Sequence, residues 1–367
     1  MATLVLDHLD LTYPDGTRAV KSVDLTVEEG EFCVFLGPSG CGKTSTLRMI
    51  AGLENPTGGE IRIDGRVVNN LYPGEREIAM VFQHYALYPN KTVRDHFEMP
   101  LKAARMPKGE RARRIADTAE LLHMTDLLDA KPRQLSGGQA QRTAIGRALI
   151  RQPKLFLLDE PLTSLDAKLR LETRTALKRL QEDLQITTVY VTHDQEEALS
   201  LADKIMVMHD GEIQQIATSH ELYANPVNLF VAGFIGTPPM NTAPTDFVAD
   251  GQDGSLRAET FNLHLTERAA HAVRQSGGDG RLVAGVRPED LVVVEPRGDL
   301  SLGGVVTVTE LQGDEWIVSV EVAPGTIWKA RTPRLDANTP QTGQQIGLRI
   351  RPGRLRLFDA VSGNAVY

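Results

Sequence analysis

The sequence predicts an α/β fold over residues 1–235, built on a mostly parallel sheet, and an all-β fold over residues 236–367. Three observations support this prediction. Apolar segments with strand character alternate with helical segments along the first part of the chain, which is typical of a parallel sheet covered on both faces. A glycine-rich turn joins one such strand to one such helix. Beyond Gly236, short segments of alternating polarity are separated by Gly and Pro turns.

The composition is that of an ordinary globular protein and excludes several classes. The 367 residues include 41% hydrophobic and 24% charged side chains, and no apolar run approaches the ~18 residues of a membrane span. A net charge of −8 argues against a general nucleic-acid binder. Asp7 interrupts the N-terminal segment before an apolar region forms, so we expect no secretory signal. Cys33 and Cys41 match neither a zinc set nor a disulfide framework, which favours a reduced, cytoplasmic compartment.

The elements of the first domain follow in a regular order. Apolar runs predict strands, and apolar residues at helical spacing predict helices. The predicted strands are residues 19–27, 31–37, 59–65 (a short hairpin arm), 78–83, 154–160 and 187–193. The predicted helices are residues 43–53, the charged, Ala- and Leu-rich stretch 93–131, and segments between the later strands. This alternation is what predicts the parallel sheet.

The second domain follows a segment with the composition of a linker. Residues 237–246, TPPMNTAPTD, are rich in Pro and Thr, which favours a connecting loop. Beyond it, alternating polarity predicts strands within residues 303–311, 315–322 and 346–358. We expect these strands to form a small barrel.

The segment from Gly37 to Thr44, GPSGCGKT, fits the phosphate-loop pattern G-x-x-x-x-G-K-[ST]. In such a loop the glycines let backbone N–H groups turn toward phosphate oxygens, while Lys43 reaches the β- and γ-phosphates and the Thr44 hydroxyl ligates Mg²⁺. A glycine-rich turn that merely opens a helix is the weaker alternative. The predicted ATP contacts here are Gly37, Pro38, Ser39, Gly40, Cys41, Gly42, Lys43, Thr44 and Ser45.

Polar residues end three of the predicted strands. Asp159 and Glu160 end LFLLDE, Gln83 ends IAMVFQ, and His193 ends TTVYVTH. The carboxyl ends of parallel strands line the ligand crevice, so Gln83, Asp159 and His193 are expected to converge on the γ-phosphate. Asp159 would hold Mg²⁺, together with Thr44 and Gln83, and Glu160 would orient or deprotonate the attacking water. The predicted catalytic residues are Glu160, His193 and Gln83.

Two further features admit more than one interpretation. Tyr13, just before the turn PDGT, is expected to stack on adenine, although an edge-strand aromatic is a fair rival. Ser136 and Gln139, in LSGGQ, form a capping box at a helix start. Capping does not explain Gly137 and Gly138, where alanine would favour a helix, whereas glycines permit close approach to an anion.

These motifs together resemble those of the ATP-binding cassette (ABC) ATPases. In order they are Tyr13, GPSGCGKT, Gln83, LSGGQ, LFLLDE, SLD at residues 164–166, and His193. The resemblance spans the chain and implies a phosphate-loop NTPase cassette with antiparallel β and helical subdomains. In that family two cassettes pack head to tail, and each ATP lies between one chain's phosphate loop and its partner's serine–glycine turn. The resemblance implies a homodimer of this kind, in which the nucleotide contacts include Ser136, Gly137, Gly138, Gln139 and Asp166.

A narrower resemblance concerns the subfamily. NKTVRD, PLTSLDAKLR, FIGTPPMN and AGVRPEDL resemble the ATPase subunits of bacterial carbohydrate importers, of the maltose and glycerol-3-phosphate type. It implies an OB-like (TOBE) C-terminal domain that dimerises or binds a regulatory protein. It also implies two membrane permease subunits, a substrate-binding protein as indirect partner, and a peripheral location at the cytoplasmic face of the inner membrane. Ala140 departs from the family, which has a longer polar residue there.

The same resemblance implies that HYALYPNKTV, after Gln83, docks a cytoplasmic helix of the permease. Tyr85, Leu87 and Tyr88 are many apolar groups for a loop, although they would equally suit the packing of a helical subdomain. Two rival functions stay open: a soluble ABC protein acting on nucleic acid or ribosomes, and a β-domain that senses a metabolite. One cassette, an acidic balance and the lack of a heptad insert disfavour the first, so we expect no nucleic-acid partner.

Overall fold

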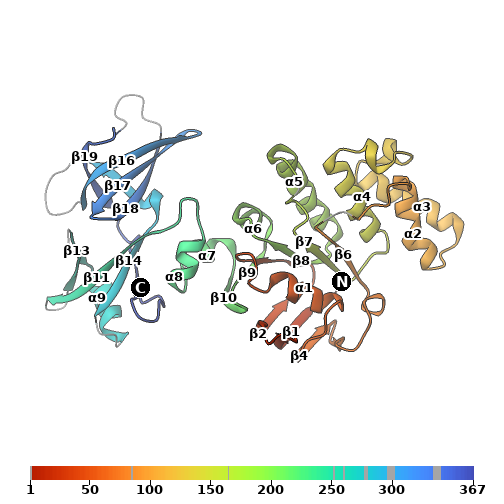
Figure 1. The fold of residues 1–367 in the computed structure, drawn as a ribbon, viewed down its shortest axis with the longest axis horizontal. Coiled ribbons are helices and arrows are strands. Elements are labelled where there is room, and N and C mark those ends of the chain that lie inside the picture. The colour runs from red at the N-terminus through yellow and green to blue at the C-terminus, as the bar shows by residue number, and fades with distance from the viewer. Residues whose placement is uncertain are drawn as a thin grey trace. The chain divides into compact units, whose positions relative to one another are not determined.

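The computed structural model describes residues 2–83, 86–163, 165–250, 253–258, 261–276, 280–295, 302–333 and 340–367. The chain divides into two compact units, Met1–His220 and Glu221–Tyr367 (Figure 1). The division falls at residue 220, whereas the sequence analysis placed it at 235. The difference arises because helix α8 (Leu229–Phe234) lies in the second unit.

One layer of the first unit is an antiparallel sheet in the strand order β2-β1-β4-β5. Its strands are β1 (Leu4–Thr12), β2 (Arg18–Val27), β4 (Gly58–Ile63) and β5 (Arg66–Val67). The sequence predicts β2 and β4 but not β1, in which the alternation of buried residues is interrupted. His8 adopts a φ of 46°, and the pairing with β2 shifts register there. This sheet is the expected antiparallel β subdomain.

The main sheet has six strands in the order β10-β9-β3-β8-β7-β6. They are β3 (Phe32–Leu36), β6 (Ile78–Val81), β7 (Leu155–Asp159), β8 (Thr187–Thr192), β9 (Lys204–His209) and β10 (Glu212–Ala217). All neighbouring pairs are parallel except β9 with β10. Strands β3 and β7 are buried along their whole length, which explains their continuous apolar sequences. The carboxyl ends of the parallel strands therefore share one edge, as predicted.

The first unit contains two groups of helices (Figure 1). One group follows or connects strands of the main sheet, and the other forms a separate helical subdomain. Helix α1 (Lys43–Ala51) follows β3, α5 (Ala167–Leu184) joins β7 to β8, and α6 (Gln195–Leu201) joins β8 to β9. The helical subdomain consists of α2 (Val93–Ala103), α3 (Lys108–Leu121) and α4 (Gly137–Leu149), with short 3-10 turns at η2 (Thr125–Leu127) and η3 (Pro132–Gln134). The stretch 93–131 is helical as predicted but divided, because Arg105 adopts a φ of 55° and Pro107 restarts the chain as the N-cap of α3.

The second unit contains two five-stranded antiparallel sheets, in the orders β13-β12-β11-β14-β20 and β15-β19-β16-β17-β18. The first sheet comprises β11 (Asn241–Asp250), β12 (Asp253–Arg257), β13 (Asn262–Leu265), β14 (Arg281–Val286) and β20 (Arg356–Asp359). The second comprises β15 (Leu291–Val294), β16 (Leu302–Gln312), β17 (Glu315–Ala323), β18 (Thr326–Pro333) and β19 (Gln345–Ile350). The prediction of an all-β second domain is confirmed in its two sheets, to which the structure adds helices α7 (Ser219–Ala224), α8 and α9 (Glu267–Gln275).

The expected linker over residues 237–246 is wrong for most of its length, because strand β11 begins at Asn241. Pro244 is tolerated there because its part of β11 pairs with β14 alone, while β12 pairs only from Asp246 onward. The missing N–H of the proline therefore need not break a second ladder. Among the described residues, no helix is long and apolar enough to cross a membrane.

Candidate nucleotide site

The phosphate loop leaves the buried strand β3 and turns tightly into α1. A Cβ atom on Gly37 would lie 2.3 Å from the carbonyl oxygen of Met208, and one on Gly42 would lie 2.4 Å from that of Ala19. Gly42 also has a φ of 104° as the N-cap of α1. Both glycines therefore let the loop approach neighbouring backbone more closely than any other residue allows. The result is a cradle whose shape depends on fixed backbone.

Lys43 begins α1 and folds back over this loop. Its Nζ donates to the carbonyl oxygens of Gly37 at 2.7 Å and Pro38 at 2.8 Å, and the side chain is almost fully buried. Nζ also lies 3.7 Å from Cys41 Sγ, so its acceptors among the described residues are all uncharged. A buried ammonium group with only uncharged acceptors is matched to an anion, because a charge-assisted bond to phosphate is stronger than a bond to a carbonyl. Burial raises the pKa of the neighbouring Cys41 thiol, so this residue acts as a small neutral filler.

Two of the predicted Mg²⁺ ligands already contact each other. Thr44 Oγ1 donates to Oδ1 of Asp159 at 3.1 Å. Burial raises the pKa of the Asp159 carboxyl, and the hydrogen bond from Thr44 opposes that shift. A hydroxyl and a carboxylate are the oxygen ligands that Mg²⁺ takes beside phosphates, so the donor set fits this ion.

The predicted catalytic side chains meet at the end of β7. Oε2 of Glu160 lies 3.3 Å from His193 Nδ1, 3.3 Å from Thr163 Oγ1 and 3.5 Å from Gln83 Nε2. Glu160 has a φ of 43°, and its N–H donates to the carbonyl of Val191 at 3.0 Å. This left-handed conformation turns the chain sharply out of the strand and directs the carboxylate toward the loop. Gln83 and His193 therefore lie together at Glu160, and their convergence with Asp159 on a γ-phosphate stays a prediction.

A cavity of about 510 Å³ lies against the phosphate loop. Its lining includes the predicted Tyr13, Ser39, Gly40, Gly42, Lys43, Thr44, Ser45 and Glu160. The Tyr13 hydroxyl lies 3.0 Å from Ser45 Oγ, so the ring stands at the rim beside the start of α1. Arg18, Lys21 and Asp210 also line the cavity and were missed, because surface charges in β2 and after β9 carry no motif. Strand alternation, which turns Lys21 away from the core-facing Val20, was the available signal.

The second glycine-rich helix start stands apart from this cavity, whose described lining includes none of Ser136–Gln139. The predicted capping box is present: Ser136 Oγ accepts the N–H of Gln139, and Gln139 Oε1 accepts that of Ser136. A Cβ on Gly138 would lie 2.6 Å from a methyl group of Leu169 in α5. Gly138 thus has a packing role within its own chain that the sequence analysis missed. Asp166 caps α5, its Oδ1 accepting the N–H of Leu169.

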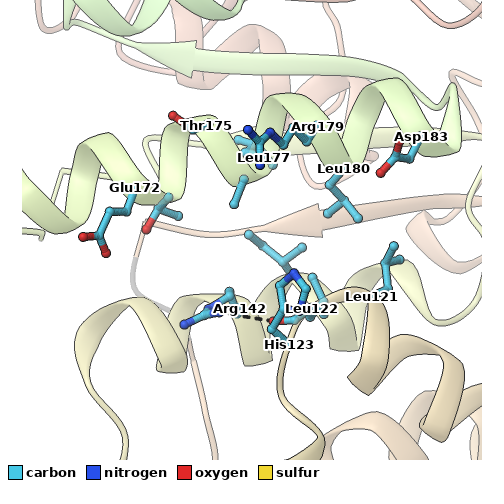
Figure 2. Close-up of a pocket in the computed structure, with 13 residues that line it drawn as sticks. Leu121, Leu122, His123, Arg142, Glu172, Thr175, Leu177, Arg179, Leu180 and Asp183 are labelled. Atoms are coloured by element: carbon cyan, nitrogen blue, oxygen red, sulfur yellow. Dashed lines mark hydrogen bonds between the residues drawn. The ribbon is translucent and has the colours of Figure 1, made fainter.

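A second cavity, of about 260 Å³, lies between α5 and the helical subdomain. Figure 2 shows Leu177 and Leu180 of α5 directed toward Leu122, His123 and the Arg142 side chain across this space. None of the predicted site residues lines it, so it belongs to the seam between subdomains and not to the nucleotide site.

The predicted docking stretch is only partly visible, since His84 and Tyr85, like Ser164, lie outside the described residues. Tyr88 stacks on His96 of α2 with ring centroids 6.0 Å apart and is still 53% exposed. Its backbone N–H donates to His96 Nε2 at 2.9 Å, and Arg147 of α4 donates to the carbonyl of Ala86. The loop backbone is therefore held by the helical subdomain, while the Tyr88 ring faces solvent.

Comparison with known proteins is consistent with this geometry. Residues 20–163 match the ABC transporter family, and residues 284–358 match the TOBE domain. The trehalose import ATP-binding protein SugC of Mycobacterium tuberculosis is 51% identical, over 79% of this chain and 73% of its own length. The sn-glycerol-3-phosphate import ATP-binding protein UgpC of Rhodopseudomonas palustris is 49% identical over 98% of both chains. The xylose/arabinose import ATP-binding protein XacK of Haloferax volcanii is 45% identical over 100% and 96%.

Solved structures agree with the fold of the first unit. A dimeric ATP-binding cassette in a post-hydrolysis state, bound to ADP and Pi, is 36% identical, with a TM-score of 0.53. The match covers 59% of this chain and 98% of that one. With the phosphate loop, the strand-end acids and full-length relatives in agreement, the chain belongs to the ABC transporter family, as an ATP-hydrolysing import subunit with a C-terminal TOBE domain.

Proposed function

We propose that this subunit couples hydrolysis of MgATP to import of a carbohydrate or sugar-phosphate. The observation that carries the proposal is the meeting of Gln83 and His193 at the carboxylate of Glu160, beside the phosphate loop. The import relatives named for trehalose, pentoses and glycerol phosphate support the substrate class. The soluble ABC alternative has no comparable support. Substrate choice would reside in the permease and the substrate-binding protein, since the proposed site of this subunit would bind a nucleotide and not the transported substrate.

The phosphate loop accounts for binding. Lys43 would exchange its bonds to the carbonyls of Gly37 and Pro38 for phosphate oxygens, with the loop N–H groups around them. Thr44, Asp159 and Gln83 would hold Mg²⁺, which neutralises charge developing on the β- and γ-phosphates. The Tyr13 ring would stack on adenine at the cavity rim.

Glu160 and His193 account for hydrolysis. The Glu160 carboxylate would orient the attacking water and accept its proton. The half-exposed His193 ring would donate to charge that develops on the γ-phosphate, with Nδ1 held by Glu160. Gln83, at the start of the loop that leads to Tyr88, would respond to nucleotide bound in the same site.

The opposite half of each site would come from a second copy. Ser136 and Gly137 are exposed at the start of α4, where the helix dipole places partial positive charge. In a head-to-tail homodimer this turn, together with Asp166, would contact the γ-phosphate held by the partner's loop. Binding of two ATP molecules would close the dimer and drive the permease, an interface switch of a familiar kind.

The surroundings of the subunit follow from this proposal. Two permease subunits would each present a cytoplasmic helix to the loop after Gln83, where Leu87 and the exposed Tyr88 stand. The subunit would thus sit peripherally at the cytoplasmic face of the bacterial inner membrane, with the substrate-binding protein as an indirect partner. The TOBE domain would stabilise the dimer or bind a regulatory protein.

Replacement of Glu160 by Gln tests the chemical step. The amide still hydrogen-bonds water but cannot take its proton, so we expect turnover to fall by at least about 100-fold while ATP affinity is kept. Dimers should accumulate with MgATP on a sizing column. Glu182→Gln, which changes an exposed carboxylate of α5, is the control. Near-wild-type turnover of Glu160→Gln would refute the assignment.

A further inference from the structure

We propose that Arg170 is a positioning residue for hydrolysis, joining the loop that carries His193 to the loop that carries Asp166. The inference rests on the proposed catalytic role of His193. Arg170 and the two groups that it bonds, in Asp194 and Leu165, are not among the described residues that line the nucleotide cavity.

The residues on both sides of His193 are fixed by side-chain hydrogen bonds. Thr192 Oγ1 donates to Oε2 of Glu197 at 2.8 Å and accepts the backbone N–H of Asp194 at 3.0 Å. The Tyr190 hydroxyl donates to the same Oε2 at 2.7 Å. Thr192, Tyr190 and Glu197 are all nearly inaccessible to solvent. The half-exposed His193 ring is thus presented by a buried, hydrogen-bonded frame.

Arg170, in the first turn of α5, extends this frame to a second loop. Its Nη1 lies 3.4 Å from Oδ2 of Asp194, and its Nη2 donates to the carbonyl of Leu165 at 3.1 Å. Leu165 directly precedes Asp166, and Asp194 directly follows His193. One guanidinium group therefore ties together the two loops that flank the site.

The chemistry of this bridge requires an arginine. A planar guanidinium has several N–H donors in a fixed fork and can bond a carboxylate and a carbonyl at once, whereas a lysine ammonium is a single flexible point charge. Arg170 and Asp194 are 35% and 27% exposed, and such half-exposed ion pairs contribute little to stability. The contribution of Arg170 is therefore geometric. Through its two bonds, a shift of the Leu165–Asp166 segment is transmitted to Asp194 and so to His193.

The consequence concerns the dimer. If Asp166 contacts the partner, as proposed, then docking of the partner fixes the Leu165–Asp166 segment. Through Arg170 it also fixes the position of His193 in the same chain. Hydrolysis would then be fast only in a closed dimer, without any direct contact between the partner and His193.

The test is steady-state and single-turnover ATPase kinetics of Arg170→Ala and Arg170→Lys in the full chain. We expect Arg170→Ala to lower kcat about tenfold with KM for MgATP within about twofold of wild type, because positioning is lost but binding is not. Arg170→Lys should recover only part of the rate. Arg174→Ala, one turn along α5, removes a cation 4.0 Å from Glu196 and should leave kcat unchanged.

A second comparison separates positioning from general damage. In a His193→Ala background, Arg170→Ala should cause no further loss, because its effect acts through His193. Wild-type kcat for Arg170→Ala, or a further loss of the same size in the His193→Ala background, would overturn the inference. If Arg170→Ala fails to fold by thermal melting, Arg170→Lys is compared in both backgrounds instead. Wild-type turnover of His193→Ala itself would refute the proposed catalytic role.

Discussion

The chain contains two glycine-rich helix starts, and their glycines meet different neighbours. In the phosphate loop, a Cβ on Gly37 or Gly42 would strike a backbone carbonyl at 2.3–2.4 Å. At the start of α4, a Cβ on Gly137 or Gly138 would meet side-chain carbons of leucines, the nearest at 3.1 and 2.6 Å. Backbone cannot move aside, whereas a leucine side chain can change rotamer.

The phosphate loop and the turn Ser136–Gln139 therefore differ in how much of a binding site one chain supplies. The phosphate loop packs closely against backbone of its own chain at Met208 and Ala19. The Lys43 side chain bonds the loop, and a cavity lies against it. The turn Ser136–Gln139 satisfies its own capping bonds and leaves Gly137 exposed. The first start therefore has its binding geometry built in, while the second offers a surface that a partner's nucleotide would complete.

The largest expected effect comes from Gly42→Ala. The new methyl group would meet the carbonyl of Ala19 at 2.4 Å and force a φ of 104° on alanine, so we expect ATP affinity to fall by at least about 100-fold. Gly40→Ala is the matched control, because Gly40 has a similar φ of 82° with nothing within 4 Å. Calorimetric titration with ATP measures both. Equal losses would mean that strain, and not backbone contact, governs the loop.

The next prediction concerns which nucleotide Gly137 serves. Lys43→Ala removes a phosphate contact, and Gly137→Asp sets a like charge against the γ-phosphate, so each variant alone should be inactive. In a head-to-tail mixed dimer both lesions fall on one composite site, and the other site stays intact. Nucleotide retained per purified mixed dimer should exceed that of either variant alone. No gain, with heterodimers confirmed, would falsify the assignment in trans.

A smaller effect tests the packing of Gly138. Alanine favours a helix by about 1 kcal/mol over glycine, but here its methyl group would meet Leu169. In a Leu169→Ala background that clash is gone, so Gly138→Ala should stabilise the chain by up to about 1 kcal/mol, whereas in the wild-type background it should not. Denaturation midpoints of the four proteins give the coupling. Additive effects would show that Leu169 is not the obstacle.

The smallest effect is expected at the cavity rim. Tyr13→Phe removes the hydroxyl that lies 3.0 Å from Ser45 but keeps the ring, so ATP affinity should change less than about threefold. Tyr13→Ala also removes the stacking surface and should cost about tenfold. Titration with ATP and with triphosphate alone separates the two contributions. An unchanged affinity in Tyr13→Ala would favour the edge-strand interpretation.

Residues that follow a strand or form a contiguous motif were predictable from the sequence. Lys43, Asp159 and Glu160 lie in motifs, and the parallel sheet brings His193 to Glu160 because both directly follow strands. The packing of Gly138 on Leu169, and the bridge from Arg170 to Asp194, join segments distant in sequence without any periodic signal. Tertiary contacts of this kind depend on how helices dock, which local pattern does not encode.

The secondary-structure predictions that were wrong or missing have the same origin. Residues 237–246 have the composition of a loop, yet Asn241–Asp250 form β11 because β14 pairs with its first part and β12 with its second. The bulge at His8 interrupts the alternation by which β1 would have been recognised. In both places pairing with a distant strand overrides local preference.

The 260 Å³ cavity beside α5 has a mechanical consequence. Side chains that border this open cavity have no protein atoms packed against them on that side, so small displacements there break few protein contacts. The first turn of α5, in contrast, is held by the Arg170 ion pair and by the close approach of Gly138 to Leu169. Helix α5 is therefore held to neighbouring segments at its first turn and borders an open cavity farther along its length. We therefore expect a displacement of the helical subdomain against α5 to break fewer contacts beside this cavity than next to Arg170.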